Sequence, residues 1–176
     1  MAKIRTLSSE TVHSNPWFRV RHDRTELPDG SNGNYFVIER EPYCLIVAEH
    51  DNRFMLIEED RYTSGTRVLD FPGGWIEPGE EPGKAALREL EEEAGYRAEA
   101  LRLLTAPYAS IGYSKARCYI YTVTGKLERV GQKLEASEEG LKVLWMTRQE
   151  IAERLARVPE SSGDVLKCLA AYDMFR

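Results

Sequence analysis

Apolar and polar residues alternate along much of the chain in short runs typical of β-strands. Two such runs, residues 17–27 and 35–38, flank the turn signal Pro28-Asp29-Gly30 and predict an N-terminal β-hairpin. A turn is expected at Asp51-Asn52 and a loop over residues 60–67. Further strands are expected at residues 44–48, 54–57, 68–71, 98–105, 117–124 and 141–146.

Three helices are predicted among these strands. Residues 82–94 form the clearest one, because Pro82 suits a first helical turn and Gly95 is placed to end the helix. Its small apolar face consists of Ala85, Ala86, Leu90 and Ala94. The sequence Thr147-Arg148-Gln149-Glu150 is a capping box that opens a second helix, and a third is expected near residues 163–175. Strands interleaved with few helices favour an α/β fold, with a mixed sheet and helices packed on its faces.

Length and composition fit this fold. The chain has 176 residues, enough for one domain of ordinary size, and 42% of them are hydrophobic. The apolar run Cys44–Ala48 is far shorter than the roughly 20 residues that a bilayer crossing needs. The N-terminus lacks the apolar region of a secretory signal. A cytoplasmic protein without a membrane partner is therefore expected.

The cysteines and histidines are too scattered to form a recognisable metal or disulfide pattern. Cys44, Cys118 and Cys168 have neither the pairing of a disulfide framework nor a zinc spacing, and we expect buried, inert thiols. The histidines are His13, His22 and His50, also far apart in the sequence. Any metal site must therefore consist mainly of oxygen ligands.

Negative charge is concentrated in one segment. The net charge of −5 argues against a nucleic-acid partner. Residues 77–93 contain seven glutamates but only Lys84 and Arg88 as cations, so this segment accounts for the net charge. The glutamates are Glu77, Glu80, Glu81, Glu89, Glu91, Glu92 and Glu93. Such a cluster repels itself unless cations occupy it.

Three of these carboxylates share one face of the predicted helix. Glu89, Glu92 and Glu93 stand at positions i, i+3 and i+4, where each like-charge pair costs a few tenths of a kcal/mol. Their grouping suits a hard divalent cation such as Mg²⁺, which prefers oxygen ligands. Arg88 can anchor one carboxylate, and a solvated acidic helix face is the alternative interpretation.

The whole segment resembles the Nudix hydrolase signature at every fixed position. It contains, in order, Gly74, five residues, Glu80, seven residues, Arg88-Glu89-Leu90, one residue, Glu92-Glu93, one residue and Gly95-Tyr96. The resemblance implies a Nudix α/β/α sandwich with a mixed β-sheet and a small N-terminal β-hairpin extension. It implies a hairpin segment at residues 1–42, for dimerisation and substrate contact, followed by the hydrolase domain at residues 43–176.

The resemblance also implies a chemistry. Nudix enzymes hydrolyse a nucleoside diphosphate linked to another moiety, here with Mg²⁺ as the expected cofactor and Mn²⁺ as a possible substitute. The implied metal ligands are the carbonyl of Gly73 and the side chains of Glu89, Glu92 and Glu93. Arg88 would orient the glutamates, while Glu80 would have a structural role. Attack of water on a phosphorus atom would then be assisted by the metal.

Residues outside the signature resemble the branch that hydrolyses ADP-ribose and nucleoside diphosphate sugars. They are the hairpin with Leu27–Gly30, the Glu39-Arg40 pair and the segment Glu59–Tyr62. This branch usually forms homodimers through an exchanged N-terminal segment. Arg61 would contact a phosphate or the terminal ribose, Glu39 and Arg40 would lie near the base, and Tyr113 could line the pocket. A solvated Arg61 and a surface ion pair at Glu39 and Arg40 are the alternatives.

One loop departs from this branch. Where the branch commonly has Ser-Pro-Gly followed by a glutamate, this chain has Ile111 in place of the proline and Lys115 near the position of the glutamate. Lys115 could contact a phosphate. The catalytic base would then come from a later acidic loop, with Glu138 and Glu139 as the candidates.

Two alternative functions stay open. The first is a Nudix hydrolase of nucleoside triphosphates or dinucleoside polyphosphates, and the second is a non-catalytic module that senses a nucleotide. The intact set of Arg88, Glu89, Glu92 and Glu93 argues against the second. The chain contains neither a Gly-x-Ser-x-Gly elbow nor a P-loop, so acyl transfer and motor NTPase activity lack support.

Overall fold

A computed structural model describes residues 3–157 and 163–176 and divides the chain into two compact units. The first unit comprises the chain up to Pro42 together with Pro107–Cys118. The second comprises Tyr43–Ala106 and Tyr119–Arg176. The segment of residues 107–118 thus belongs with the N-terminal part of the chain, although the 64 residues of Tyr43–Ala106 separate the two in the sequence.

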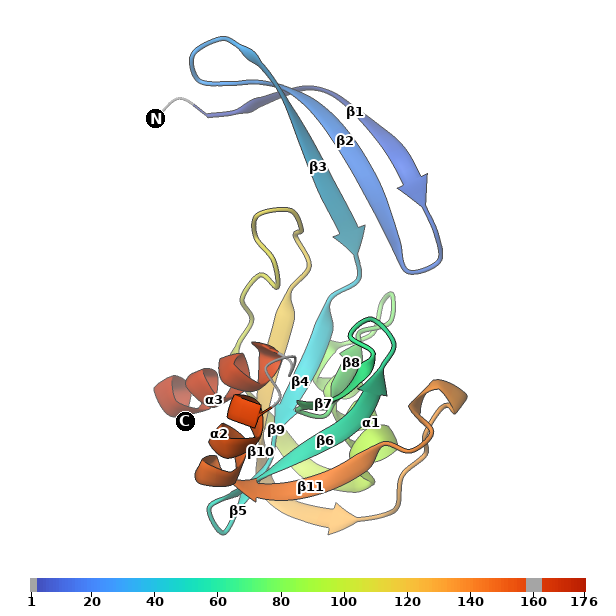
Figure 1. The fold of residues 1–176 in the computed structure, drawn as a ribbon, viewed down its shortest axis with the longest axis vertical. Helices are drawn as coiled ribbons and strands as arrows, with labels where there is room; N and C mark the ends of the chain where they lie inside the picture. The colour runs from blue at the N-terminus through green and yellow to red at the C-terminus, as the bar shows by residue number, and fades with distance from the viewer. Residues whose placement is uncertain (1–2, 158–162) are drawn as a thin grey trace. The chain divides into compact units, whose positions relative to one another are not determined.

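The first unit contains an antiparallel sheet of three strands (Figure 1), in the order β1 (Arg5–Ser14), β2 (Phe18–Glu26) and β3 (Asn32–Arg40). The predicted hairpin corresponds to β2 and β3, whereas β1 is an addition. Strand β1 was missed because it has no buried side: all ten of its residues are exposed. Within the same unit, the backbone N–H of Ile38 donates to the carbonyl of Tyr113 at 2.7 Å.

The second unit is built on two groups of strands (Figure 1). One sheet has the order β8-β4-β10-β9, and the other has the order β11-β6-β5 with β7 paired to β6. The strands are β4 (Tyr43–Val47), β5 (Glu49–His50), β6 (Arg53–Arg61), β7 (Thr66–Asp70), β8 (Gly73–Trp75), β9 (Tyr96–Thr105), β10 (Cys118–Arg129) and β11 (Lys142–Thr147). Each predicted strand of this region is present. The expected loop over residues 60–67 is shorter, because β6 and β7 pair up to Arg61 and Thr66.

The helices begin and end where local signals place them. Helix α1 (Pro82–Ala94) ends at Gly95, whose left-handed φ of 71° lets its N–H reach the carbonyl of Glu91 at 3.1 Å. A short 3-10 helix, η1 (Ala136–Glu138), precedes β11. Helix α2 (Arg148–Arg157) has the predicted capping box, since the N–H of Thr147 donates to Glu150 and the N–H of Glu150 donates to Thr147. Helix α3 (Gly163–Phe175) is the last element.

Helix α1 lies close to the first sheet of the second unit because its apolar face consists of small residues. Ala85, Ala86 and Leu90 are fully buried in one cluster with Cys44 and Ile46 of β4. Glu89 and Glu93 are buried on the same side of the helix, whereas Glu91 and Glu92 are only partly buried. The three cysteines are buried thiols outside any disulfide, as predicted. No helix of the described residues combines the length and the hydropathy that a membrane crossing requires.

Candidate active site

Strand β8 and helix α1 meet at two glycines. The N–H of Gly73 donates to Glu93 Oε2 at 2.8 Å. A Cβ atom at Gly74 would lie 2.5 Å from the carboxyl group of Glu89, so only glycine allows this approach. Gly73 and Gly74 follow the strand predicted at residues 68–71, and they form a short strand of their own by pairing with Leu45 and Cys44. The two buried carboxylates of α1 are thus packed against backbone.

Arg88 connects the acidic residues of the segment to one another. Its Nη1 donates to Glu89 Oε1 at 2.8 Å and to Glu92 Oε2 at 3.0 Å. Its Nε and Nη2 donate to the two carboxylate oxygens of Glu80 at 3.1 and 3.0 Å, and Nη2 also donates to the carbonyl of Trp75. The hydrogen bonds from Arg88 hold the pKa of Glu80 below its ordinary value. One guanidinium therefore sets the positions of three carboxylates.

Two further carboxylates join the site from other elements. Burial raises the pKa of Glu93 well above its ordinary value, and the charges of Glu89, Glu138 and Glu59 act in the same direction. Burial is also the main cause of the raised pKa values of Glu59 and Glu89. Glu59 comes from β6 and Glu138 from η1. We call Glu59, Glu89, Glu93 and Glu138 the acidic pocket.

Glu59 was not among the predicted site residues. It is 8% exposed, and Arg61 Nη2 lies 2.6 Å from its Oε1. That oxygen nevertheless accepts no hydrogen bond of suitable geometry from the described residues. The signal that could have identified Glu59 is its place just after the buried run Phe54–Ile57, on the same side of β6 as Met55 and Ile57. An acidic residue at an inward position of a strand indicates a function or a buried partner.

The donor set of the acidic pocket suits a hard divalent cation. Carboxylate oxygens are the ligands that Mg²⁺ prefers, and the oxygen of Glu59 without a hydrogen bond is one that a cation or its water would satisfy. As arranged, however, no three His, Cys, Asp or Glu side chains of the described residues converge to hold a metal ion. Glu89 and Glu92 point to Arg88, and Glu93 points to the N–H of Gly73. Changes of side-chain rotamer are needed for these carboxylates to share one ion.

Glu138 and Glu139, the two candidates for the catalytic base, differ in their burial and contacts. Glu138 is half-buried and its Oε2 accepts a hydrogen bond from the N–H of Glu135 at 2.9 Å. The charge of Glu138 also contributes to the raised pKa of Glu93. Glu139 is exposed. Of the two, Glu138 is therefore the residue whose charge acts on the acidic pocket.

The predicted substrate contacts fall in both units. In the first unit, Arg40 and Tyr113 line one pocket of about 240 Å³ together with Phe18, Ile38, Ala109, Ser110 and Ser114. Lys115 is exposed. Glu39 forms ion pairs with Arg21 and Arg19, so the ion-pair interpretation accounts for its contacts, with partners on β2. In the second unit, Arg61 is half-exposed and pairs with Glu59.

Comparisons with known proteins cover nearly the whole chain. The NUDIX domain family matches residues 40–167, and the nucleoside diphosphate sugar hydrolase N-terminal domain matches residues 4–38. ADP-ribose pyrophosphatase from Mycobacterium tuberculosis is 32% identical over 168 residues, which are 94% of this chain and 78% of that protein. ADP-ribose pyrophosphatase from Bacillus subtilis is 28% identical over 136 residues, 77% of this chain and 73% of that protein.

A solved structure supports the same fold. A crystal structure described as an ADP compounds hydrolase has a TM-score of 0.83 and 24% sequence identity. The match covers 98% of this chain and 93% of that one. At this identity the likeness concerns the fold, which agrees with the predicted α/β class and its mixed sheets.

Proposed function

The chain belongs to the Nudix hydrolase family, and on that premise we propose that it hydrolyses ADP-ribose or a related nucleoside diphosphate sugar. The products are a nucleoside monophosphate and a sugar phosphate. The observation that carries the proposal is the geometry of the signature helix, where Arg88 binds Glu80, Glu89 and Glu92 and the N–H of Gly73 binds Glu93. The match of residues 4–38 to the N-terminal domain of nucleoside diphosphate sugar hydrolases supports the substrate class.

We propose Mg²⁺, with Mn²⁺ as a substitute, as the cofactor of this site. The residues that would hold the cation are Glu89, Glu92, Glu93 and the carbonyl of Gly73. When bound, such a cation polarises a phosphate group and lowers the pKa of water. Arg88 keeps Glu89 and Glu92 in place through its hydrogen bonds, with Glu80 as its own anchor. Gly73 holds the carboxylate of Glu93 through its N–H.

We assign proton transfer and substrate binding to further side chains. Glu138 accepts the proton of the attacking water, with Glu139 on the same loop as the second candidate. Arg61 contacts a phosphate or the terminal ribose of the substrate. Arg40 and Tyr113 line the pocket that we assign to the nucleoside. Glu39 contacts the base, and Lys115 binds a phosphate. These partners are small nucleotides in the cytoplasm, rather than nucleic acid or a membrane.

A substrate panel tests this proposal. The protein is incubated with Mg²⁺ and ADP-ribose, sugar derivatives of ADP, UDP and GDP, NADH or nucleoside triphosphates, and the products are identified. We expect AMP and ribose 5-phosphate from ADP-ribose, or the corresponding monophosphate from another sugar nucleotide. Ile111 and Lys115 depart from the loop of the ADP-ribose branch and so count against ADP-ribose as the specific substrate. Triphosphates or dinucleoside polyphosphates are the second candidate. Activity on triphosphates alone would refute the first proposal.

We also propose a homodimer formed through the N-terminal sheet. Strand β1 is an edge strand of ten exposed residues, and large apolar side chains of this sheet and its first turn are exposed: Leu7, Val12, Trp17 and Phe36. A long exposed edge strand and a group of exposed apolar side chains both mark surfaces that pair with another chain. Light scattering coupled to size exclusion is expected to give about twice the chain mass of 20.1 kDa. Replacing Leu7 and Val12 with lysine should shift the protein toward monomer, and a wild-type monomer would contradict the proposal.

A further inference from the structure

The loop between β10 and β11 is attached at its beginning to the end of helix α1. The N–H groups of Val130 and Gly131 both donate to the carbonyl of Gly95, at 2.8 and 3.0 Å. The N–H of Lys133 donates to the carbonyl of Glu92 at 2.8 Å. The side chain of Gln132 donates to the carbonyl of Glu93 at 2.6 Å. The beginning of the loop is therefore hydrogen-bonded to the backbone carbonyls of Glu92, Glu93 and Gly95. The side chains of Glu92 and Glu93 belong to the candidate active site.

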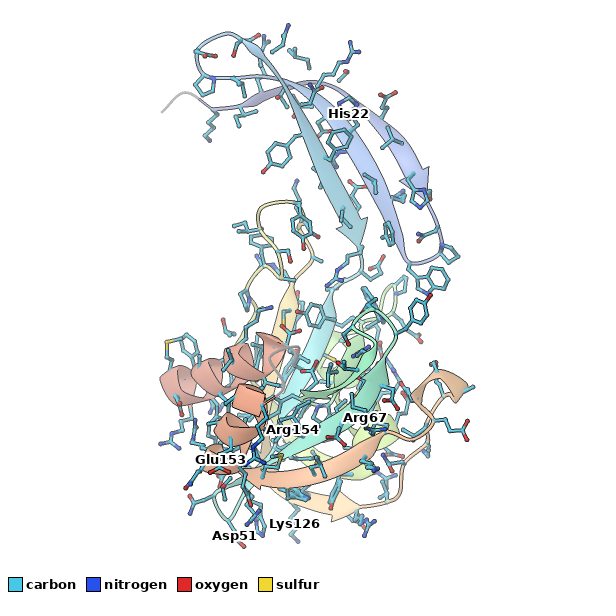
Figure 2. All side chains as sticks on the ribbon, in the orientation of Figure 1. His22, Asp51, Arg67, Lys126, Glu153 and Arg154 are labelled. Atoms are coloured by element: carbon cyan, nitrogen blue, oxygen red, sulfur yellow. The ribbon has the colours of Figure 1, made fainter. Side chains whose placement is uncertain are left out.

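Arg67 attaches the other end of this loop. Its Nη2 donates to the carbonyl of Gly140 at 3.0 Å and to the carbonyl of Glu58 at 3.0 Å. Its Nη1 donates to Asp60 at 2.8 Å, and its Nε donates to Glu58 Oε2 at 3.3 Å. Arg67 lies on β7 beside β6 (Figure 2), so the guanidinium joins both strands to the loop. We call residues 132–140 the tethered loop.

Glu138 lies between the two attachments and close to the second. The N–H of Leu141 donates to the carbonyl of Glu138 at 2.9 Å, which closes a turn around Gly140. Leu141 is buried. A displacement of the Gly140 carbonyl therefore moves the turn that carries Glu138. The first attachment binds the loop to the backbone of Glu92 and Glu93, and Arg67 binds its other end to Glu58 and Asp60, which flank Glu59. Glu138 is thereby held between the signature helix and β6.

From these contacts we propose that Arg67 is a positioning residue, which fixes Gly140 and thereby holds Glu138 at the acidic pocket. The inference rests on the proposed function, because it assigns Glu138 a role in hydrolysis. Arginine suits this position because its planar group has five donors in a fixed geometry, whereas a lysine has one mobile ammonium. Three acceptors on β6 and one in the loop use that geometry here.

Arg154 is a matched control. It comes from α2 (Figure 2). It pairs with Oε1 of Glu58, while Arg67 pairs with Oε2 of the same carboxylate. The two side chains are almost equally exposed, at 33% and 31%. Loss of either arginine removes an ion pair of Glu58. Only the loss of Arg67 also removes the hydrogen bond to the Gly140 carbonyl.

The test compares Arg67→Met with Arg154→Met, each in the wild type and in Glu138→Gln, using Mg²⁺ and the best substrate of the panel. We expect Arg67→Met to lower kcat by about 10- to 100-fold with little change in KM, as for residues that orient catalytic groups. Arg154→Met should stay within about two-fold of the wild type, by the usual small effect of a half-exposed ion pair. In the Glu138→Gln background, Arg67→Met should cause no further loss of kcat.

Hydrogen exchange gives a readout that does not depend on activity. Amides of the tethered loop should exchange faster in Arg67→Met than in Arg154→Met. If Arg67→Met does not fold, Arg67→Lys keeps the charge without the planar group and should show a smaller loss of kcat of the same kind. Equal losses in the Arg67 and Arg154 variants, multiplicative losses with Glu138→Gln, or unchanged exchange would overturn the inference. Full activity of Glu138→Gln would also overturn it and leave the proposed function standing.

Discussion

Replacement of Glu93 with glutamine is expected to lower kcat/KM by about 10²- to 10³-fold, equivalent to several kcal/mol of transition-state stabilisation by a metal site. The amide keeps the size of the side chain and can still accept the hydrogen bond from the N–H of Gly73. It loses the negative charge that we assign to cation binding. Steady-state kinetics with Mg²⁺ and the substrate of the panel measure the effect.

Stability measurements distinguish this loss from misfolding. The folded-state pKa of Glu93 is raised, so its ionisation opposes folding, and the stability it contributes at low pH is lost as pH rises through that value. Without metal, Glu93→Gln should therefore unfold at the same or a higher temperature than the wild type, with a difference that widens from pH 5 to pH 8. Added Mg²⁺ should stabilise the wild type more than the variant.

Glu91→Gln is the control for Glu93→Gln on the same helix. Glu91 pairs with Arg97 and Lys133 and lies outside the acidic pocket, so its variant should stay within about two-fold of wild-type activity, as expected for a surface ion pair. Near wild-type hydrolysis by Glu93→Gln would show that the assignment of this residue to the metal is wrong.

Replacement of Gly73 with alanine is expected to cost about 3 kcal/mol or more of folding free energy, as a severe case of overpacking. The new Cβ atom would lie 2.1 Å from the carbonyl oxygen of Cys44 and 2.9 Å from the Cα of Leu45, both in backbone that cannot rotate away. Strand β8 would have to separate from β4. Thermal unfolding should show a fall in Tm of roughly 10 °C for a chain of this size.

Alanine variants of two other glycines serve as comparisons for Gly73→Ala. At Gly74 the new Cβ would meet the carboxyl group of Glu89, a side chain that can rotate, so Gly74→Ala should lose activity with a smaller loss of stability. At Gly112 nothing lies within 4 Å, and Gly112→Ala should change the unfolding free energy by less than about 0.5 kcal/mol, as at most surface sites. A stable Gly73→Ala variant would mean that β8 is not held against β4 in this way.

The parts of the fold that follow from local signals were predictable from the sequence. Helix α1 has the predicted bounds because Pro82 and Gly95 act on the chain next to them. The capping box at Thr147 and Glu150 likewise depends on residues three apart. The signature residues Arg88, Glu89 and Glu92 contact one another because they occupy one helical turn.

Features that depend on distant residues were not predictable in this way. Strand β1 has no apolar face, so its pairing with β2 leaves no pattern in the sequence. Glu59 joins the acidic pocket only because β6 lies beside the signature helix in the folded unit. The contact of Arg67 with Gly140 links residues 73 positions apart. Spacing along the chain carries no information about such contacts.

The N-terminal sheet has a consequence for the order of folding. Strands β1, β2 and β3 are consecutive in the sequence, so their pairing needs only short loops to close. Local pairings of this kind form within microseconds to milliseconds, far faster than a ribosome adds residues. The sheet can therefore form during synthesis, long before residues 107–118 of its own unit have been made. During that interval its exposed apolar side chains are open to unwanted association, and nascent chains are most vulnerable at this stage.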